Sequence, residues 1–328
     1  MTTSLDGLRV RVRVPASSAN LGPGFDSVGL ALGVWDEAEV MVGGEGLRIR
    51  VDGEGADQVP VDERHLVYRC LALGLLELGC SPAPGMELSC LNRIPHSRGM
   101  GSSATAAVTG FTLASALYVA SSESVPEGEL PVDRDFVNEM AARVEGHPDN
   151  SSASVFGGMT VSWAEGASGI GFSTARIPVH EDVVPVVLVP DVELSTAAAR
   201  AALPTEVSLR AAAATAGRAA LLVEAMSRRP DLLMAATCEW LHQEQRRIAY
   251  PSTMRVVDAL RAAGFAAVVS GAGPTVMVLT TRDCSAQAEA CATTVCAESP
   301  GHWQVLTPGV PVGGAEAALA GRGYPAGA

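Results

Sequence analysis

A stretch rich in Gly and Ser precedes a long Ala-rich segment and has the composition of an anion-binding turn. It reads Pro-His-Ser-Arg-Gly-Met-Gly-Ser-Ser-Ala over residues 95–104. Where such a turn enters a helix, unpaired backbone N–H groups and the positive end of the helix dipole face one point. Gly99 and Gly101 allow the backbone to approach a bulky anion, and the hydroxyl of Ser102 or Ser103 could reach a phosphate-bound Mg²⁺. An ordinary helix cap is the alternative, but the order of strand, Pro, loop and long helix favours a phosphate-binding site.

Lysine is absent from the chain, because all 23 basic residues are Arg. Without a lysine amine, Schiff-base aldolases, pyridoxal-phosphate enzymes, P-loop NTPases and protein kinases are excluded. The 36 acidic residues leave a net charge of −13. This balance argues against nucleic acid or an anionic membrane surface as the main partner, because both require basic patches.

The remaining composition predicts a soluble, cytoplasmic protein with reduced thiols. Of the 328 residues, 48% are apolar, enough for a substantial core in two domains or one large α/β unit. The seven cysteines include no CxxC pair, which argues against a disulfide framework or a zinc site. The N-terminus lacks the pattern of a signal peptide, and we expect no uncharged apolar run near the ~20 residues of a membrane span.

Hydropathy patterns in the first half indicate the elements that position the loop. Alternation of Arg9, Arg11 and Arg13 with Val predicts a strand over 8–15, followed by a structured loop over 16–33. We expect further strands at 36–42, 47–52 and 86–94. Helices are predicted over 63–78, 102–120 and 133–145, with Asp133 as the N-cap of the last and Gly146 at its end.

The second half has a different pattern, with a boundary near 160–170. A Val-rich strand over 183–189 is followed by predicted helices near 196–202, 208–228, 231–248 and 252–263. A hairpin over 265–270 and 275–279, a helix over 285–297 and a strand over 303–307 complete it. The interpretation is an α+β protein with domains at 1–165 and 166–311 and a flexible tail at 312–328.

Three ordered motifs resemble those of the GHMP small-molecule kinases. They are the loop at 95–104, the segment Val-Pro-Ala-Ser-Ser-Ala-Asn-Leu-Gly-Pro-Gly-Phe-Asp-Ser-Val-Gly-Leu over 14–30, and Ser-Gly-Ala-Gly-Pro-Thr over 270–275. Two segments are most similar to motifs of the family branch that acts on homoserine. They are the second motif and the segment Glu-Gly-His-Pro-Asp-Asn over 145–150. The likeness runs from about residue 10 to residue 310.

The resemblance implies a fold and a reaction. The fold would be the two-domain GHMP kinase fold, with an N-terminal domain like ribosomal S5 domain 2, a ferredoxin-like C-terminal domain and the active site between them. The reaction would be phosphorylation of the L-homoserine hydroxyl by ATP with Mg²⁺, in threonine biosynthesis, and family members are commonly homodimers. A GHMP kinase acting on another small alcohol and an inactive nucleotide-binding relative remain alternatives.

The resemblance also assigns residues to ATP and the metal. Glu139 lies eleven residues before Asn150, where the family carries its Mg²⁺-binding glutamate, so Glu139 and Ser102 would hold the metal between the β- and γ-phosphates. A surface pair with Arg143 is the alternative role of Glu139. The residues expected to bind ATP are Pro95, His96, Ser97, Arg98, Gly99, Met100, Gly101, Ser102, Ser103, Ala104 and Thr105.

The charged groups of homoserine have candidate partners. Asp26 suits the ammonium group, with a turn hydrogen bond as its alternative role. Arg200 and Arg246 stand where the family places its carboxylate-binding arginines, and guanidinium groups suit a bidentate carboxylate. Arg247 competes with Arg246 for that role. Backbone N–H groups at Gly271 and Gly273 would close the pocket.

The acceptor hydroxyl lies, by resemblance, against Asn20 and Asn150. Neither amide is a base near neutral pH. Because a loose transition state needs little activation of the nucleophile, we expect positioning of the hydroxyl to suffice. Asp149 is a less favoured candidate base, interpreted mainly as a turn residue, and His147 would orient the substrate loop. Residues 151–154 read Ser-Ser-Ala-Ser where the family usually has Val-Ala-Pro-Ala, a departure expected to alter packing more than chemistry.

Overall fold

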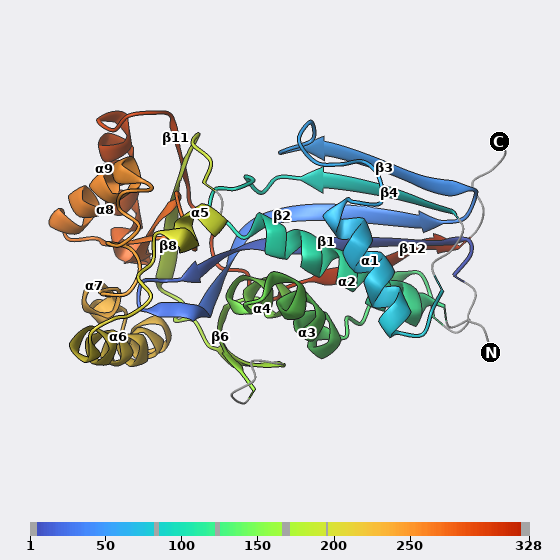
Figure 1. Cartoon of the computed structure of the whole chain (residues 1–328), viewed down its shortest axis with the longest axis horizontal. Coiled ribbons are helices and arrows are strands. Elements are labelled where there is room, and N and C mark those ends of the chain that lie inside the picture. Colours follow the sequence, from blue (N-terminus) through green and yellow to red (C-terminus); the bar gives the residue numbers. More distant parts are fainter. Residues whose placement is uncertain (1–4, 82–84, 122–124, 166–170, 195, 323–328) are drawn as a thin grey trace.

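The computed structural model describes residues 5–81, 85–121, 125–165, 171–194 and 196–322. Two sheets follow one another along the longest axis of the molecule (Figure 1). The larger has the order β3-β4-β2-β1-β12-β5, with β6 and β7 attached through β2. Its strands are β1 (Leu8–Asn20), β2 (Gly24–Val42), β3 (Gly46–Gly53), β4 (Gly85–Asn92), β5 (Gly128–Leu130), β6 (Met159–Ala164), β7 (Phe172–Ile177) and β12 (Glu316–Arg322).

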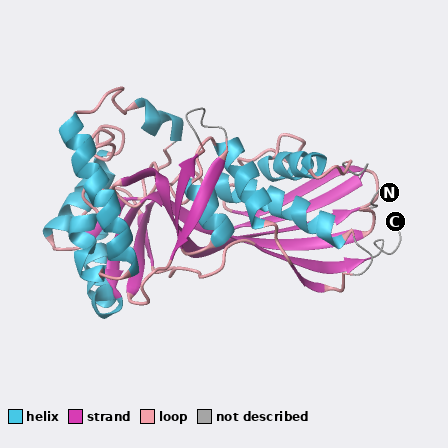
Figure 2. Cartoon of the chain, turned by 90° about the horizontal axis from the view of Figure 1, so that it is seen from below, coloured by secondary structure: helices cyan, strands magenta, loops and turns pink. Residues whose placement is uncertain are grey.

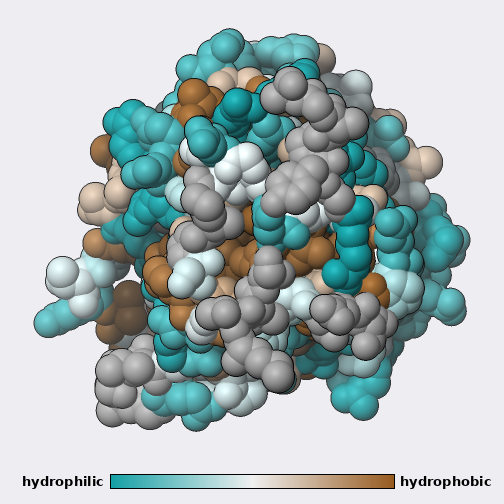
Figure 3. Space-filling view, turned by 90° about the vertical axis from the view of Figure 1, so that its right-hand side faces the viewer, coloured by the Kyte–Doolittle hydropathy of each residue, from teal (hydrophilic) through white to brown (hydrophobic). Residues whose placement is uncertain are grey.

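Helices cover one face of this sheet (Figure 2). They are α1 (Leu66–Glu77), α2 (Ser102–Ala120), α3 (Arg134–Glu145) and α4 (Asp149–Phe156). Val10, Val40 and Leu88 of the sheet pack with Leu71 of α1 and Leu117 of α2 in one apolar core. Seen from the end of the molecule that carries the two termini, hydrophobic side chains gather at the centre of the surface and hydrophilic ones surround them (Figure 3).

Helix α2 corrects one expectation from the sequence. It is 19 residues long, carries no charged side chain, and by length and composition alone could cross a membrane. However, 78% of its most apolar window is buried inside the fold, so it is the central helix of the first core. The expectation that no uncharged apolar run approaches the length of a membrane span was therefore wrong, because Ala, Thr and Ser in this run obscure its apolar character.

The smaller sheet has the order β11-β8-β10-β9 with antiparallel neighbours. Its strands are β8 (Val183–Pro190), β9 (Ala266–Val269), β10 (Val276–Thr281) and β11 (Trp303–Leu306). Helices α5 (Thr196–Ala201), α6 (Leu209–Ser227), α7 (Leu233–Ala236) and α8 (Pro251–Ala262) lie between β8 and β9 in the chain, together with the 3₁₀ turn η1 (Pro230–Leu232). The turn η2 (Arg282–Cys284) and α9 (Ser285–Ala297) lie between β10 and β11. This is the split βαβ order of a ferredoxin-like domain, and it confirms the expected α+β architecture.

The loop predicted over 16–33 is instead the continuation of a long hairpin. β1 extends to Asn20 and β2 starts at Gly24, with pairs such as Ser17 with Ala31 and Ala19 with Gly29. These small residues are buried, and the two strands pack against α4 and the C-terminal domain. A strand that is buried on both faces loses its polar–apolar alternation, so the sequence pattern could not reveal it.

The predicted domain limits also need correction. β7 pairs with β6, so the N-terminal sheet continues past residue 165 to Ile177. Residues 316–322 of the predicted flexible tail form β12, which pairs with β1 and β5; residues 323–328 lie outside the described part. The C-terminal end of the chain thus returns to the first domain and completes its sheet.

The helix predicted over 231–248 is short, since regular structure ends at Ala236. The carboxylate of Glu239 accepts backbone hydrogen bonds from Leu241, His242 and Gln243. A side chain that takes these N–H groups competes with regular helical hydrogen bonding. The result is an irregular segment over 237–249, which carries Arg246 to the site.

Candidate active site

The loop before α2 bends through backbone conformations that favour glycine. Gly99 and Gly101 have φ angles of 79° and 71°, and Gly101 directly precedes the first helical turn. Backbone hydrogen bonds hold the loop from both domains: Thr275 N donates to Arg98 O at 3.1 Å, and Ser17 N donates to Met100 O at 3.2 Å. The loop is therefore a preformed part of the domain junction.

A cavity of about 340 Å³ opens at the start of α2. Among the residues expected to bind phosphate, those that line it are Ser97, Gly99, Gly101, Ser102, Ser103 and Ala104. Pro95, Met100 and Thr105 are buried behind the loop, and the Arg98 guanidinium donates instead to the carbonyl groups of Pro190 and Asp191. The surface that faces the cavity thus consists of glycines, serines and the N-terminal end of a helix, which together suit an anion.

Gly99→Ala is expected to raise KM for ATP, because the new Cβ would lie 2.4 Å from Ser270 O and 2.9 Å from Gly273 O. The loop would have to move away from the helix start. Gly79→Ala is the matched control: Gly79 has a similar φ of 75° but open space around it. Steady-state kinetics and thermal melting would separate the two variants. An equal effect of both on KM would mean that backbone strain, rather than the contact, is responsible.

A second cavity of about 290 Å³ shares Ser97, Ser102 and Ser103 with the first. It is also lined by His96 and His65. His65 is 5% exposed, and its Nδ1 has no hydrogen-bond partner in the described structure. The two cavities therefore meet at the start of α2, so a ligand that extends through both would have its middle at the helix N-terminus.

The wall of this second cavity also contains Asp36, whose carboxylate accepts the N–H groups of Arg93 and Ile94 at 2.7 and 3.0 Å. Burial raises the pKa of Asp36 to about 6. These two hydrogen bonds fix the end of β4, from which the phosphate-binding loop departs.

Two side chains expected to bind opposite ends of an amino acid bind each other. Arg200 of α5 donates two hydrogen bonds to the Asp26 carboxylate, at 2.7 and 3.1 Å. Both residues line the first cavity, with 38% and 36% of their side-chain surfaces exposed. Both residues were predicted from the sequence to bind a ligand, but only the structure shows that they pair with each other.

Arg246 lies in the wall of the same cavity, and the structure separates it from Arg247. Arg246 is 2% exposed, and its Nε donates to Ala199 O at 3.1 Å. No carboxylate of the described chain forms an ion pair with it, and burial lowers its pKa. Arg247 is more exposed and is paired with Glu244 and Asp258. Arg246 is therefore the candidate for binding a ligand carboxylate.

An aromatic platform that the sequence analysis missed supports both arginines. The Phe25 ring centroid lies 5.9 Å from the guanidinium carbon of Arg200 and 5.6 Å from that of Arg246. Phe25 also stacks on the fully buried ring of His242, which donates from Nε2 to Gly22 O at 2.8 Å. Phe25 stands next to Asp26 in a motif that was already recognised, whereas His242 gave no signal because its segment was predicted to be a regular helix.

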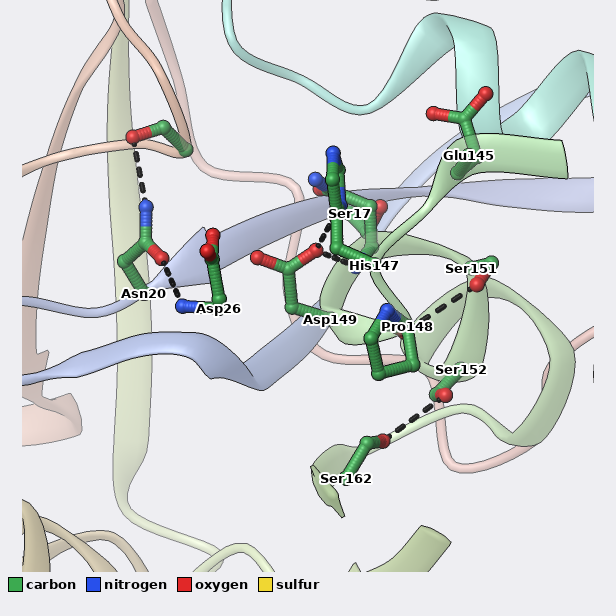
Figure 4. A network of polar contacts seen from close by, with 12 residues as sticks. Ser17, Asn20, Asp26, Glu145, His147, Pro148, Asp149, Ser151, Ser152 and Ser162 are labelled. Atoms are coloured by element: carbon green, nitrogen blue, oxygen red, sulfur yellow. Dashed lines mark hydrogen bonds and ion pairs between the residues drawn. The ribbon is translucent and has the colours of Figure 1, made fainter. Parts of the chain in front are cut away.

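Asn20 and Asn150 both line the cavity, but their amides have different partners. Asn20 donates from Nδ2 to Gly271 O at 2.9 Å and accepts the Asp26 N–H at Oδ1, 3.0 Å away (Figure 4). Asn20 thus joins the β1–β2 turn to the loop over 270–275, whose Gly271 and Gly273 also line the cavity. Asn150 accepts from Ser17 Oγ at 3.1 Å, while its Nδ2 makes no hydrogen bond to the described residues. Asn150 is the amide better placed to contact a ligand.

His147 and Asp149 form a pair beside Asn150 (Figure 4). Asp149 Oδ1 lies 2.8 Å from His147 Nδ1 and also accepts the Asn150 N–H at 2.8 Å. The hydrogen bond to Asp149 raises the pKa of His147. Both side chains line the cavity, so the pair orders the start of α4 at the cavity wall.

The serines of segment 151–154, where this chain differs from the usual family sequence, lie next to the pair of His147 and Asp149. Ser152 Oγ donates to Asn138 Oδ1 at 2.7 Å and is 3.0 Å from Ser162 Oγ, which donates to it. Ser154 Oγ is buried without a hydrogen-bond partner in the described structure. The Ser152 hydroxyl thus joins α4 to α3 and β6. The difference from the family sequence therefore concerns packing behind the cavity, which Ser151, Ser152 and Ser154 do not line.

Glu145, rather than the predicted Glu139, lines the cavity near the start of α2. The carboxylate of Glu139 is half exposed and pairs with Arg143, and Glu139 does not line the cavity. Glu145 lines it and accepts a 2.8 Å hydrogen bond from Ser103 Oγ, and burial raises the pKa of Glu145. Six residues on an α-helix correspond to a rotation of about 240°, so both cannot share one face of α3. Glu145 could have been found from its place at the start of the motif at 145–150.

The contact with Glu145 also involves Ser103 rather than Ser102, although both serines line the cavity. Within the described chain no group of three His, Cys, Asp or Glu side chains could by itself hold a metal, and the seven cysteines are free thiols. A magnesium ion bound to nucleotide phosphates needs only one or two protein carboxylates. The partly buried Glu145 carboxylate beside a hydroxyl fits such an ion.

The chain matches two family models, "GHMP kinases N terminal domain" over residues 65–158 and "GHMP kinases C terminal" over residues 210–297. Homoserine kinase from Rhodococcus erythropolis is 50% identical over 287 residues, which cover 86% of this chain and 89% of that protein. Homoserine kinase from Streptomyces avermitilis is 48% identical over 270 residues, which cover 82% and 85%. The crystal structure of homoserine kinase from Cytophaga hutchinsonii is similar in fold, with a TM-score of 0.80 and 24% identity over 96% of this chain and 98% of that one.

Proposed function

The chain belongs to the GHMP kinase family, and on this premise we propose that it transfers a phosphoryl group from ATP to the hydroxyl of L-homoserine, giving O-phospho-L-homoserine for threonine biosynthesis. One observation carries the proposal. The glycines and serines at the start of α2 line the same cavity as Asp26, Arg200 and Arg246. An anion-binding helix terminus thus faces groups of both charges, which suit an amino acid.

ATP would extend from one cavity into the other. Its phosphates would lie at Gly99, Gly101 and the first N–H groups of α2, where the helix dipole favours negative charge. The adenosine would occupy the second cavity, in which the free Nδ1 of the buried His65 offers a hydrogen-bonding group. The acceptor would occupy the first cavity, so the transferred group would pass along the start of α2.

Glu145 and the Ser103 hydroxyl would hold Mg²⁺ on the nucleotide. When bound, the ion neutralises charge on the phosphates. Glu145 itself is partly buried, which raises its pKa. An adjacent cation would favour its ionised form. Ser103 would turn its hydroxyl from the Glu145 carboxylate so that both oxygens face the ion.

Asn150 would position the acceptor hydroxyl. Its Oδ1 is held by Ser17 at 3.1 Å, which orients its Nδ2 group for a ligand oxygen. The pair of His147 and Asp149 fixes the backbone N–H of Asn150. Alignment of the hydroxyl with the phosphoryl group is the main requirement of a loose transition state.

Asp149→Asn separates this positioning role from base catalysis. We expect kcat to stay within about tenfold of the unchanged enzyme, since a loose transition state needs little activation of the nucleophile and Asn can still accept the Asn150 N–H. Steady-state rates from pH 6 to pH 9 provide the measurement. A loss of about 10²–10⁴-fold, the usual contribution of a general base, would assign Asp149 that role instead.

The function is tested by measuring ADP release with L-homoserine, mevalonate, shikimate and galactose as acceptors, and by identifying the phosphorylated product by ³¹P NMR. Fastest turnover on L-homoserine supports the proposal. Faster turnover on another alcohol favours a different GHMP kinase activity, and nucleotide binding without turnover on any acceptor favours an inactive relative.

The net charge of −13 supports the further proposal that neither nucleic acid nor an anionic membrane is its main partner. The free thiols of the seven cysteines support the proposal that the protein acts in the cytoplasm. A homodimer is proposed from the family resemblance alone. Light scattering after size exclusion tests it.

A further inference from the structure

His242 is a buried residue beside the candidate site to which the proposed function gives no role. Its side chain is fully buried, and its ring stacks on that of Phe25 with the two centroids 5.1 Å apart. It belongs to the irregular segment over 237–249, which also carries Arg246. The imidazole ring therefore joins this segment to the β1–β2 hairpin.

The partners of the two ring nitrogens determine which nitrogen carries the proton. Nε2 lies 2.8 Å from Gly22 O, and Nε2 must donate because a carbonyl oxygen only accepts. Nδ1 lies 3.5 Å from Arg246 Nη1, a long contact, and Nδ1 must accept because a guanidinium only donates. Burial lowers the pKa of His242, which favours the neutral ring. Both contacts thus require the same form of the ring, neutral with its proton on Nε2.

The guanidinium of Arg246 is consequently held at two of its donors. Its Nε donates to Ala199 O at 3.1 Å, and its Nη1 faces the lone pair of His242 Nδ1. One contact alone would let the planar group rotate about it, whereas two contacts fix its plane. A guanidinium donates two parallel N–H groups to a carboxylate only when its plane points at that carboxylate. Because Arg246 lines the first cavity, the direction of this plane matters for a ligand there.

We propose that His242 is a positioning residue, whose Nδ1 accepts a hydrogen bond from Arg246 and so aligns the guanidinium with the carboxylate of the acceptor. The inference rests on the proposed function, in which Arg246 binds that carboxylate. His242 does not line the cavity and acts only through Arg246. Its effect is therefore on the affinity for the acceptor and not on the phosphoryl transfer step.

Two amide variants keep different halves of the imidazole. In His242→Gln the amide N–H can still reach Gly22 O, but the acceptor at the place of Nδ1 is lost. In His242→Asn the amide oxygen can take the place of Nδ1, but the donor to Gly22 O is lost. Both variants lose the ring that stacks on Phe25, so each is the matched control for the other.

His242→Gln is expected to raise KM for L-homoserine about tenfold, the scale of one hydrogen bond to a charged group. Both kcat and KM for ATP should change less than about twofold, since only binding of the acceptor is affected. In His242→Asn, which keeps an acceptor, KM for L-homoserine should rise less than about threefold. Equal increases in the two variants, or no increase in His242→Gln, would show that Nδ1 does not position Arg246.

The double variant, His242→Gln with Arg246→Ala, tests whether the effect passes through the guanidinium. Without the guanidinium there is nothing to align, so KM for L-homoserine should stay within about twofold of its value in Arg246→Ala alone. If the two single effects multiply instead, His242 acts independently of Arg246 and the proposal is wrong.

A measurement on the unchanged protein decides the question even if circular dichroism shows that the variants do not fold. Side-chain ¹⁵N NMR distinguishes a protonated ring nitrogen from one that carries a lone pair. For His242 we expect a proton on Nε2 and none on Nδ1, with the Nδ1 resonance shifting when L-homoserine binds. A proton on Nδ1 would overturn the proposal.

Phosphorylation of L-homoserine by the unchanged protein is scored separately. Turnover together with equal effects of the two amide variants would reject the positioning role of His242 and leave the proposed function standing. No turnover would reject the proposed function, and with it the carboxylate that Arg246 is to bind.

Discussion

Glu145→Gln is expected to lower kcat for L-homoserine phosphorylation by about 100-fold or more, which corresponds to about 2.7 kcal/mol in the activation free energy. The partly buried Glu145 carboxylate would lose its charge at the start of α2, where Ser103 contacts it at 2.8 Å. Rates measured over a range of Mg²⁺ concentrations should also show a weaker apparent affinity for the metal, a change that a purely structural defect would not produce.

Glu139→Gln is the matched control for that experiment. It removes the same charge from the same helix, but at a half-exposed site whose partner is Arg143. Its kinetics should stay close to those of the unchanged protein, since exposed i,i+4 pairs contribute only about 0.3–0.5 kcal/mol. If Glu139→Gln lowered kcat severely and Glu145→Gln lowered it only mildly, the metal would be assigned to Glu139, as the sequence suggested.

Arg246→Ala is expected to raise KM for L-homoserine about 30-fold or more while KM for ATP changes little. Truncating one partner of a buried, hydrogen-bonded charge pair costs about 2–5 kcal/mol, and Arg246 is 2% exposed in the wall of the acceptor cavity. The comparison of the two KM values is the readout, because a general loss of folding would lower the amount of active enzyme without changing either.

Arg247→Ala provides the neighbouring control. Arg247 is partly exposed and its guanidinium is paired with Glu244 and Asp258, so KM for L-homoserine should hardly change. Arg246→Lys adds a second test, since it keeps the charge but not the planar pair of donors; we expect an intermediate KM. A larger effect at Arg247 than at Arg246 would move the carboxylate site to the other arginine.

Local sequence patterns were sufficient to predict an element where its structure depends mainly on residues close to it in the chain. The helix predicted over 102–120 matches α2, and those over 133–145, 208–228 and 285–297 agree with α3, α6 and α9 to within one residue at either end. Caps and helical periodicity act within a few residues. For the same reason the Gly/Ser turn before α2 could be predicted, since its glycines and the helix after it are contiguous in the chain.

Predictions failed where distant segments decide the structure. Residues 16–20 and 24–33 became strands because they pack against α4 and the C-terminal domain. Residues 316–322 became a strand because β1 and β5 were available to pair with them. The segment 237–249 is not a regular helix, because the buried Glu239 carboxylate accepts hydrogen bonds from backbone N–H groups of this segment. Each case depends on a contact that hydropathy along the chain does not contain.

The features of the candidate site also separate into those that the sequence predicted and those that only the tertiary structure decided. Residue types and their order by themselves determined a lysine-free, anion-binding helix start, the kinase family that it resembles, and most of the side chains at the cavity. Only the tertiary structure decided that Glu145 faces the cavity and Glu139 does not, that Arg246 is buried there and Arg247 is exposed, and that Arg200 is paired with Asp26. Charge and chemistry are properties of a residue and can be read from its letter, whereas the direction of a side chain and its partner depend on how separate segments pack.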